Sequence, residues 1–131
     1  MGLLLDTCAF LWLIWEDQKL SARVRELIAD AGIPLFLSAV SIWEATSKHV
    51  LGKLPVYAKE PAWQHFVRQR DRHDIAPLPL DEGAIRHLEH LPPLHRDPFD
   101  RLLICQAIEH GLGIVTPDDH IRQYPVKTLW D

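Results

Sequence analysis

Short all-apolar runs alternate along the chain with longer segments whose apolar residues recur at helical spacing. Residues 2–5 are Gly-Leu-Leu-Leu, and residues 113–116 are Gly-Ile-Val-Thr. Uninterrupted apolar runs of this length are typical of buried parallel strands. Further strands are predicted at 33–38, at 75–80, where two prolines weaken the pattern, and at 126–130 as an edge strand.

Helices are predicted between these strands, and several begin at a residue that can cap them. Asp6 or Thr7 can cap a helix that runs to residue 15, and Ser38 can cap one that ends at Gly52. Asp97, followed by proline, begins a helix that Gly111 ends. Other helical segments are expected at 21–32, 60–74, 81–91 and 116–124, the last as a capped turn or helix.

This strand–helix alternation predicts an α/β fold. The expected architecture is a three-layer α/β/α sandwich around a mainly parallel sheet of about four or five strands. With 131 residues, 47% of them hydrophobic, and no internal repeat or linker, residues 1–131 are predicted to form a single domain.

Charge and cysteine content exclude several classes of protein. A formal net charge of −4, from 18 acidic and 14 basic residues, does not suit binding of nucleic acid by bulk charge, so chemistry on nucleic acid would need a metal ion. The first apolar run is too short to span a membrane and lacks a basic leader, which predicts a cytoplasmic protein without membrane attachment. Cys8 and Cys105 are expected to be buried free thiols.

Acidic residues recur where predicted strands end and helices begin. Asp6 follows the first strand, Glu44 lies in the helix after the second, Asp100 lies in the first turn of the helix after Asp97, and Asp118 follows the strand at 113–116. In open α/β sheets, ligands bind beyond the carboxyl ends of the strands, so Asp6 and Asp118 would meet if their strands are neighbours. Clustered carboxylates repel one another, and Mg²⁺ or Mn²⁺, which prefer oxygen ligands, would compensate that repulsion.

Each acid also has a purely structural interpretation. Asp6, Asp97 and Asp118 can be helix caps, and Glu44 stands three residues after Ser41, as in a capping box. Asp119 is interpreted as a cap or a solvent-facing neighbour. Three interpretations of Asp97 remain: a helix cap, a group that hydrogen-bonds the metal ligands from outside, or a direct metal ligand. The recurrence of acids at strand ends favours a common site for the set.

On these residues the chain resembles the PIN domain, specifically the VapC toxins of bacterial toxin–antitoxin pairs. The matching stretches are LLLDTCAFLWLI, SAVSIWEATSKHVLGKL and DPFDRLLICQAIEHGLGIVTPDDHIRQYPVKTLW. They anchor both ends of the chain and most of the length between, whereas residues 55–90 match only in general character.

The resemblance implies a divalent-metal-dependent endoribonuclease that hydrolyses RNA phosphodiester bonds with a metal-activated water. Catalytic and metal-binding roles would fall to four acids, with Mg²⁺ or Mn²⁺ as cofactor: Asp6, Glu44, Asp100 and Asp118. Secondary roles at the same site are expected for three neighbours: Asp97, Thr7 and Thr116.

The implied partners are an RNA substrate, a cognate antitoxin of the VapB type and a second copy of the chain in a homodimer. Lys48 and Arg96 lie near the acid motifs and are candidates for RNA phosphate contacts. The arginines between residues 68 and 72 are interpreted as a solvated helix face. Trp12 and Trp15 are candidates for contact with the antitoxin or the second copy.

Other families fit less well. A haloacid-dehalogenase phosphatase needs a second aspartate two residues after the first, where this chain has Cys8, and a response-regulator receiver needs an acid pair that is missing. His87 with His90, and the pair His73–Asp74, lack the remaining ligands of a zinc or HD-type hydrolase. The remaining alternative is a catalytically silent PIN-like binding module that docks an antitoxin or another partner.

Overall fold

The structure, a computed structural model, describes residues 2–131. Within these residues five strands form one sheet in the order β3-β2-β1-β4-β5, and every neighbouring pair is parallel. The strands are β1 (Leu3–Leu5), β2 (Leu35–Ser38), β3 (Ala76–Leu78), β4 (Gly113–Val115) and β5 (Thr128–Leu129). The expected parallel sheet is therefore confirmed, and β1 and β4 are neighbours.

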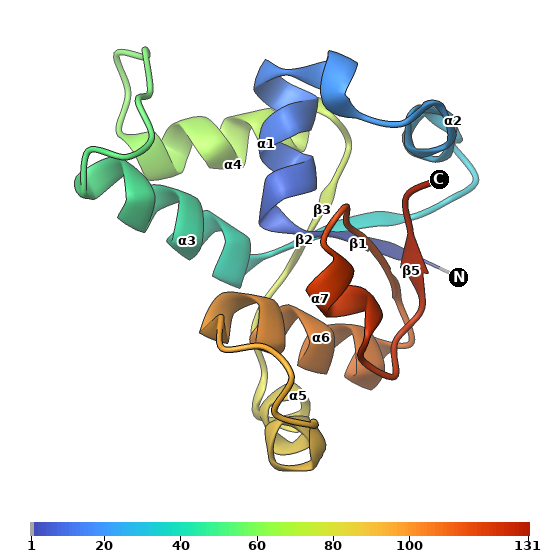
Figure 1. Cartoon of the computed structure of the whole chain (residues 1–131). Helices are drawn as coiled ribbons and strands as arrows, with labels where there is room; N and C mark the ends of the chain where they lie inside the picture. The colour runs from blue at the N-terminus through green and yellow to red at the C-terminus, as the bar shows by residue number, and fades with distance from the viewer. Residues whose placement is uncertain (1) are drawn as a thin grey trace.

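Helices cover both faces of the sheet, as Figure 1 shows. The helices are α1 (Thr7–Trp15), α2 (Ala22–Ala29), α3 (Ala39–Val50), α4 (Ala62–Arg72), α5 (Glu82–Ile85), α6 (Pro98–His110) and α7 (Asp119–Arg122). Two 3₁₀ helices, η1 (Asp17–Lys19) and η2 (Arg86–His90), complete the order. Helices α1, α2 and α4 lie on one side of the sheet and α5, α6 and α7 on the other, which confirms the three-layer sandwich.

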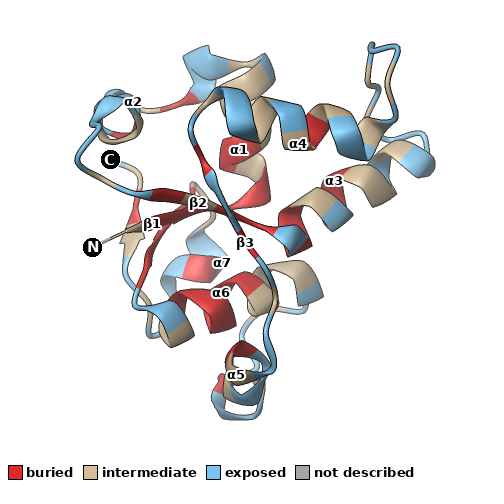
Figure 2. Cartoon of the chain, turned by 180° about the vertical axis from the view of Figure 1, so that it is seen from behind, coloured by how far each residue is buried: buried red, intermediate tan, exposed pale blue. Residues whose placement is uncertain are grey.

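Alternation along β1 builds the two halves of the core. Leu3 and Leu5 pack into one cluster with Phe10 of α1 and Phe66 of α4. Leu4 points to the opposite face and packs with α6. All three leucines are buried, as expected for a central strand covered on both sides (Figure 2).

Most predicted boundaries agree with the structure to within a few residues. Asp97 caps α6, its first residue is proline, and Gly111 at its end adopts a left-handed φ of 64°. Pro77 lies in β3, which is an edge strand, where a missing backbone donor is tolerated.

Three local expectations were wrong. The segment 81–91 is divided into α5 and η2 instead of forming one helix, and α2 ends at Ala29, before the glycine expected to stop it. Both cysteines are free thiols, but Cys8 is only half-buried.

Across residues 2–131, every helix falls short of the length and apolarity that a bilayer crossing requires.

Candidate active site

The order of the strands places the candidate site beside β1. The chain proceeds from β1 to β2 and β3 on one side and then returns to β4 and β5 on the other, so β1 and β4 flank the topological switch point. Ligands bind at such a point in open parallel sheets, beyond the carboxyl ends of the strands. Asp6 directly follows β1, and Thr116 directly follows β4.

Asp6 is buried, with 3% of its surface exposed, and it also caps α1. Its Oδ1 accepts a hydrogen bond of 2.7 Å from the backbone N–H of Ala9. The cap uses only Oδ1, so it does not involve the second carboxylate oxygen. The structural interpretation of Asp6 is therefore correct, and it is compatible with a role in the site.

Asp118 and Asp6 are linked through Thr116, which is fully buried. The Thr116 hydroxyl accepts a 3.0 Å hydrogen bond from the backbone N–H of Asp118 and hydrogen-bonds the Asp6 carboxylate. Asp118 in turn caps α7, because its Oδ1 accepts from the backbone N–H of His120 at 2.8 Å. Thr116 therefore fixes two acids from opposite sides of the switch point.

Glu44 reaches the same place from α3, and it is buried. Its Oε2 pairs with Lys48 Nζ at 3.0 Å, one helical turn away. Its Oε1 is buried and has no hydrogen-bond partner among the described residues. The capping-box interpretation was wrong, since Ser38 caps α3 and Ser41 lies inside the helix, where its hydroxyl accepts from Thr7 at 2.9 Å.

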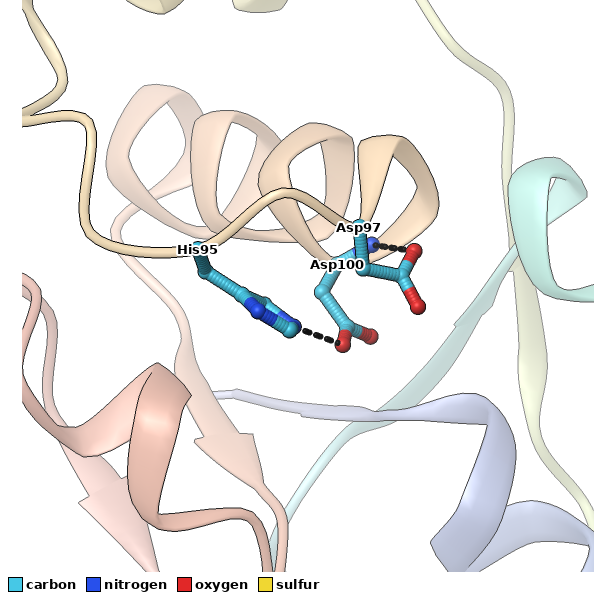
Figure 3. Close-up of side chains that lie close together, drawn as sticks. All are labelled: His95, Asp97 and Asp100. Carbon is cyan, nitrogen blue, oxygen red and sulfur yellow. Dashed lines mark hydrogen bonds and ion pairs between the residues drawn. The ribbon is translucent and has the colours of Figure 1, made fainter.

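Asp97 and Asp100 come from the start of α6. Asp97 Oδ1 accepts from the backbone N–H groups of Phe99 at 2.9 Å and Asp100 at 3.2 Å. His95 Nε2 lies 2.9 Å from Asp100 Oδ2, and Figure 3 shows its ring pointing at that carboxylate. Among residues 2–131, His95, Asp97 and Asp100 are the three possible metal-ligating side chains whose ligand atoms all lie within 4.8 Å of one another.

One cavity of about 290 Å³ collects these side chains. All four predicted catalytic acids line it, although they come from two helices and two strand ends. The described residues that line it are Asp6, Thr7, Cys8, Leu11, Trp12, Glu44, Lys48, Asp97, Asp100, Pro117 and Asp118. Five carboxylates thus face a single ammonium group, so the cavity is strongly negative.

Burial and mutual repulsion disturb the titration of two of these acids. Burial, helped by the charges of Asp100 and Asp118 and opposed by the hydrogen bonds from Thr116 and Ala9, raises the pKa of Asp6 from its usual value near 3.8 to about 7. Burial likewise raises the pKa of Asp100 to about 6, with Asp97 and Glu44 adding to the rise and His95 opposing it. Carboxyls with raised pKa values gathered in a cavity are a mark of a functional site.

The candidates for RNA and partner contacts, Arg96, Trp12 and Trp15, lie in three different environments. Arg96 is exposed and lines a separate hollow of about 230 Å³ with Arg101, beside α6. Trp12 lines the acid cavity and packs against Trp130 at a ring distance of 5.7 Å. Trp15 is 40% exposed and stacks on His65. Asp119 is solvent-facing, as expected, with 88% of its side chain exposed.

Sequence reasoning missed His95, His120 and the position of Cys8 at the cavity. His95 stands in the segment 92–97, which has no periodicity and two prolines, a pattern that predicts only a loop. Its position two residues before a capped helix was the available signal. Cys8 follows Asp6 by two residues in α1, and burial raises its pKa to about 11, so it is an inert thiol at pH 7.

The family is established by comparison with known proteins. Residues 3–127 match the family model described as PIN domain. The chain therefore belongs to the PIN-domain family, as its motifs predicted.

Individual proteins similar to this chain are VapC and VapBC proteins. It is 29% identical over 136 residues to Ribonuclease VapC22 of Mycobacterium tuberculosis, a match that covers 97% of each chain. A chain in the crystal structure of VapBC2 from Rickettsia felis, bound to a DNA fragment from its promoter, superposes with a TM-score of 0.73 at 16% identity over 100% of both chains. DNA-bound VapBC from Salmonella typhimurium gives a TM-score of 0.68 at 15% identity, over 98% of this chain and 97% of that chain. The predicted PIN-like fold is confirmed.

Proposed function

We propose that this protein is the toxin of a VapBC-type toxin–antitoxin pair and acts as a Mg²⁺- or Mn²⁺-dependent endoribonuclease. The observation that carries the proposal is the convergence of Asp6, Glu44, Asp100 and Asp118 on one cavity at the switch point of the sheet. The likeness to Ribonuclease VapC22 supports the choice of RNA as substrate.

The side chains fit a hard divalent cation. Mg²⁺ and Mn²⁺ prefer oxygen ligands, and the cavity offers carboxylate oxygens from four separate segments. Glu44 Oε1 is a buried acceptor without a partner, which is costly unless something binds it. When bound, such an ion lowers the pKa of a coordinated water and stabilises charge on a phosphodiester.

We assign the chain's own residues distinct tasks. Asp6, Glu44, Asp100 and Asp118 hold the cation, and Thr116 orients two of them. Thr7 joins the start of α1 to α3 and so keeps Asp6 and Glu44 at a fixed separation. Lys48, paired with Glu44, balances part of the charge before metal binds and can turn to an RNA phosphate afterwards. Arg96, exposed just before α6 and outside the acid cavity, would supply a second phosphate contact.

The remaining parts of the proposal concern the protein's surroundings. We propose that the chain acts as one domain in the cytoplasm, pairs with a second copy of itself, and is inhibited by a VapB-type antitoxin. Exposed Trp15 suits a protein contact, while Trp12 at the cavity wall suits an inhibitor that reaches the acids. The alternative, a silent binding module, would keep these contacts and lack the chemistry.

Cleavage of RNA by purified protein tests the function. With Mg²⁺ or Mn²⁺, wild-type protein is expected to cut cellular RNA, and chelation should stop it. Asp100→Asn should lower the rate by about a hundredfold or more, because one ligand charge is lost. Asp119→Asn, which changes an exposed neighbouring acid, is the matched control and should cleave normally. Intact RNA in every reaction, with wild type equal to Asp100→Asn, would favour the silent module.

Asp97 is proposed to act mainly as a helix cap. Asp97→Ser retains a capping oxygen, whereas Asp97→Ala removes it and should destabilise the protein by about 1 kcal/mol. Urea unfolding of both variants measures the cap, and Mn²⁺ titration measures ligation. If Asp97→Ser keeps full stability but loses most of its Mn²⁺ affinity, Asp97 is a ligand instead.

A further inference from the structure

Two acids of the cavity are each held by a histidine. His95 Nε2 lies 2.9 Å from Asp100 Oδ2, and His120 Nδ1 lies 3.2 Å from Asp118 Oδ1. In each pair the imidazole contacts one carboxylate oxygen and does not contact the second one. The two aspartates belong to different elements, since Asp100 lies in α6 and Asp118 caps α7.

The two imidazoles also contact each other. The rings of His95 and His120 stack with centroids 5.0 Å apart and an angle of only 8° between their planes. His95 is the inner ring, with 18% of its side chain exposed, whereas His120 is 62% exposed. The stack therefore connects the N-terminal ends of α6 and α7 outside the acid cavity.

The backbone of His95 is fixed on both sides. Its N–H donates a 2.8 Å hydrogen bond to the hydroxyl of Tyr124, which is buried in the core. Its carbonyl oxygen accepts from Arg101 Nη1 at 3.4 Å. A histidine in a loop is normally mobile, but these contacts and the stack hold this ring in one place. Figure 3 shows the resulting approach of His95 to Asp100 across the first turn of α6.

We propose that His95 is a positioning residue for Asp100: stacked on His120, it fixes the Asp100 carboxylate relative to Asp118 so that the free oxygens of both face one divalent cation. This role rests on the proposed metal-dependent function. Carboxylates that bind metals are commonly held by such outer hydrogen bonds, and loss of the outer partner weakens metal binding about 10- to 100-fold.

Two substitutions separate the hydrogen bond from the stacking. His95→Phe keeps an aromatic ring beside His120 but removes the N–H donor, and His95→Gln keeps a donor but removes the ring. Mn²⁺ affinity, measured by electron paramagnetic resonance, is expected to fall about 10- to 100-fold in His95→Phe. His95→Gln should restore it to within about fivefold of wild type. His110→Phe is the matched control. It breaks a similar histidine–aspartate pair outside the cavity, in which His110 Nε2 lies 3.1 Å from Asp81 Oδ2, and its Mn²⁺ affinity should equal that of wild type.

Thermal unfolding confirms that each variant is folded, and pulsed resonance of bound Mn²⁺ distinguishes positioning from ligation. We expect no coupling to a directly coordinated imidazole nitrogen. Such a coupling in wild type that is absent in His95→Gln would overturn the positioning role in favour of direct ligation. If His95→Phe binds Mn²⁺ as tightly as wild type does, the positioning role of His95 is refuted, while the metal-dependent function stands. Failure of wild-type protein to bind Mn²⁺ would refute the metal-dependent function together with it.

Discussion

Replacing Asp6 with asparagine is expected to stabilise the metal-free protein at pH 8 and to abolish its response to Mn²⁺. Asparagine keeps an oxygen that can accept from the Ala9 N–H, so the cap on α1 survives. The buried charge disappears, however. A pKa raised from 3.8 to about 7 corresponds to at most about 4 kcal/mol of destabilisation at pH 8.

The size of this effect depends on pH. Between about pH 4 and pH 7 the folded protein holds the Asp6 proton more tightly than the unfolded chain does, so the stability of metal-free wild type falls as pH rises through that window. Asp6→Asn lacks this loss. Thermal unfolding with and without Mn²⁺, with Asp119→Asn as the control, checks the prediction. An Asp6→Asn protein that is less stable than wild type without metal, or equally stabilised by Mn²⁺, would contradict it.

The affinity for Mn²⁺ is expected to weaken by about a thousandfold between pH 8 and pH 5. Metal binding requires ionised carboxylates, and Asp6 and Asp100 titrate at about 7 and about 6. Both are ionised at pH 8 and mostly protonated at pH 5, so protons compete with the ion at two ligands. Calorimetry across this range, in buffers of different ionisation enthalpy, measures both the affinity and the protons released.

Asp100→Asn removes one of these two titrating ligands and is the matched comparison. Its remaining affinity should change less steeply with pH than that of wild type. An affinity in wild type that stays constant from pH 8 to pH 5 would show that neither carboxyl binds the ion.

Much of the fold could be predicted because local signals and burial agree. The run Leu3–Leu5 is apolar at every position, a pattern typical of a strand that is covered on both faces. Helix α6 has a clear start signal at Asp97 and a clear stop signal at Gly111. The order of the strands in the sheet could not be predicted, because no local pattern shows which strands are neighbours. The adjacency of β1 and β4, which brings Asp6 to Asp118, depends on packing of the whole sheet.

The acids could be predicted, but among their partners only Lys48 has a local signal in the sequence. Lys48 pairs with Glu44 because both lie on one face of α3, four residues apart, a spacing that sequence does display. The backbone of His95, beside Asp100, is held by Tyr124, 29 residues away, and no local pattern reports that contact. The segment 81–91, divided into α5 and η2, likewise makes contacts with α6 that no local pattern reports, since Arg86 and His87 both meet Glu109.

Asp6 and Asp118 serve as helix caps and also line the cavity, and the two roles are compatible because a carboxylate has two oxygens. In both, Oδ1 accepts from the first turn of the following helix. A strand that ends in an aspartate and continues into a helix therefore delivers an anchored carboxylate to the sheet edge. The same arrangement explains why interpreting each acid separately as a cap did not exclude a common site.

Crystals grown with Mn²⁺ give the most direct measurement, through the anomalous scattering of the ion. One peak or two neighbouring peaks are expected inside the cavity, within bonding distance of carboxylate oxygens from Asp6, Asp100 and Asp118, and Glu44 Oε1 should gain a partner there. A protein crystallised in saturating Mn²⁺ at pH 8 with no anomalous density between these side chains would contradict a metal-dependent site.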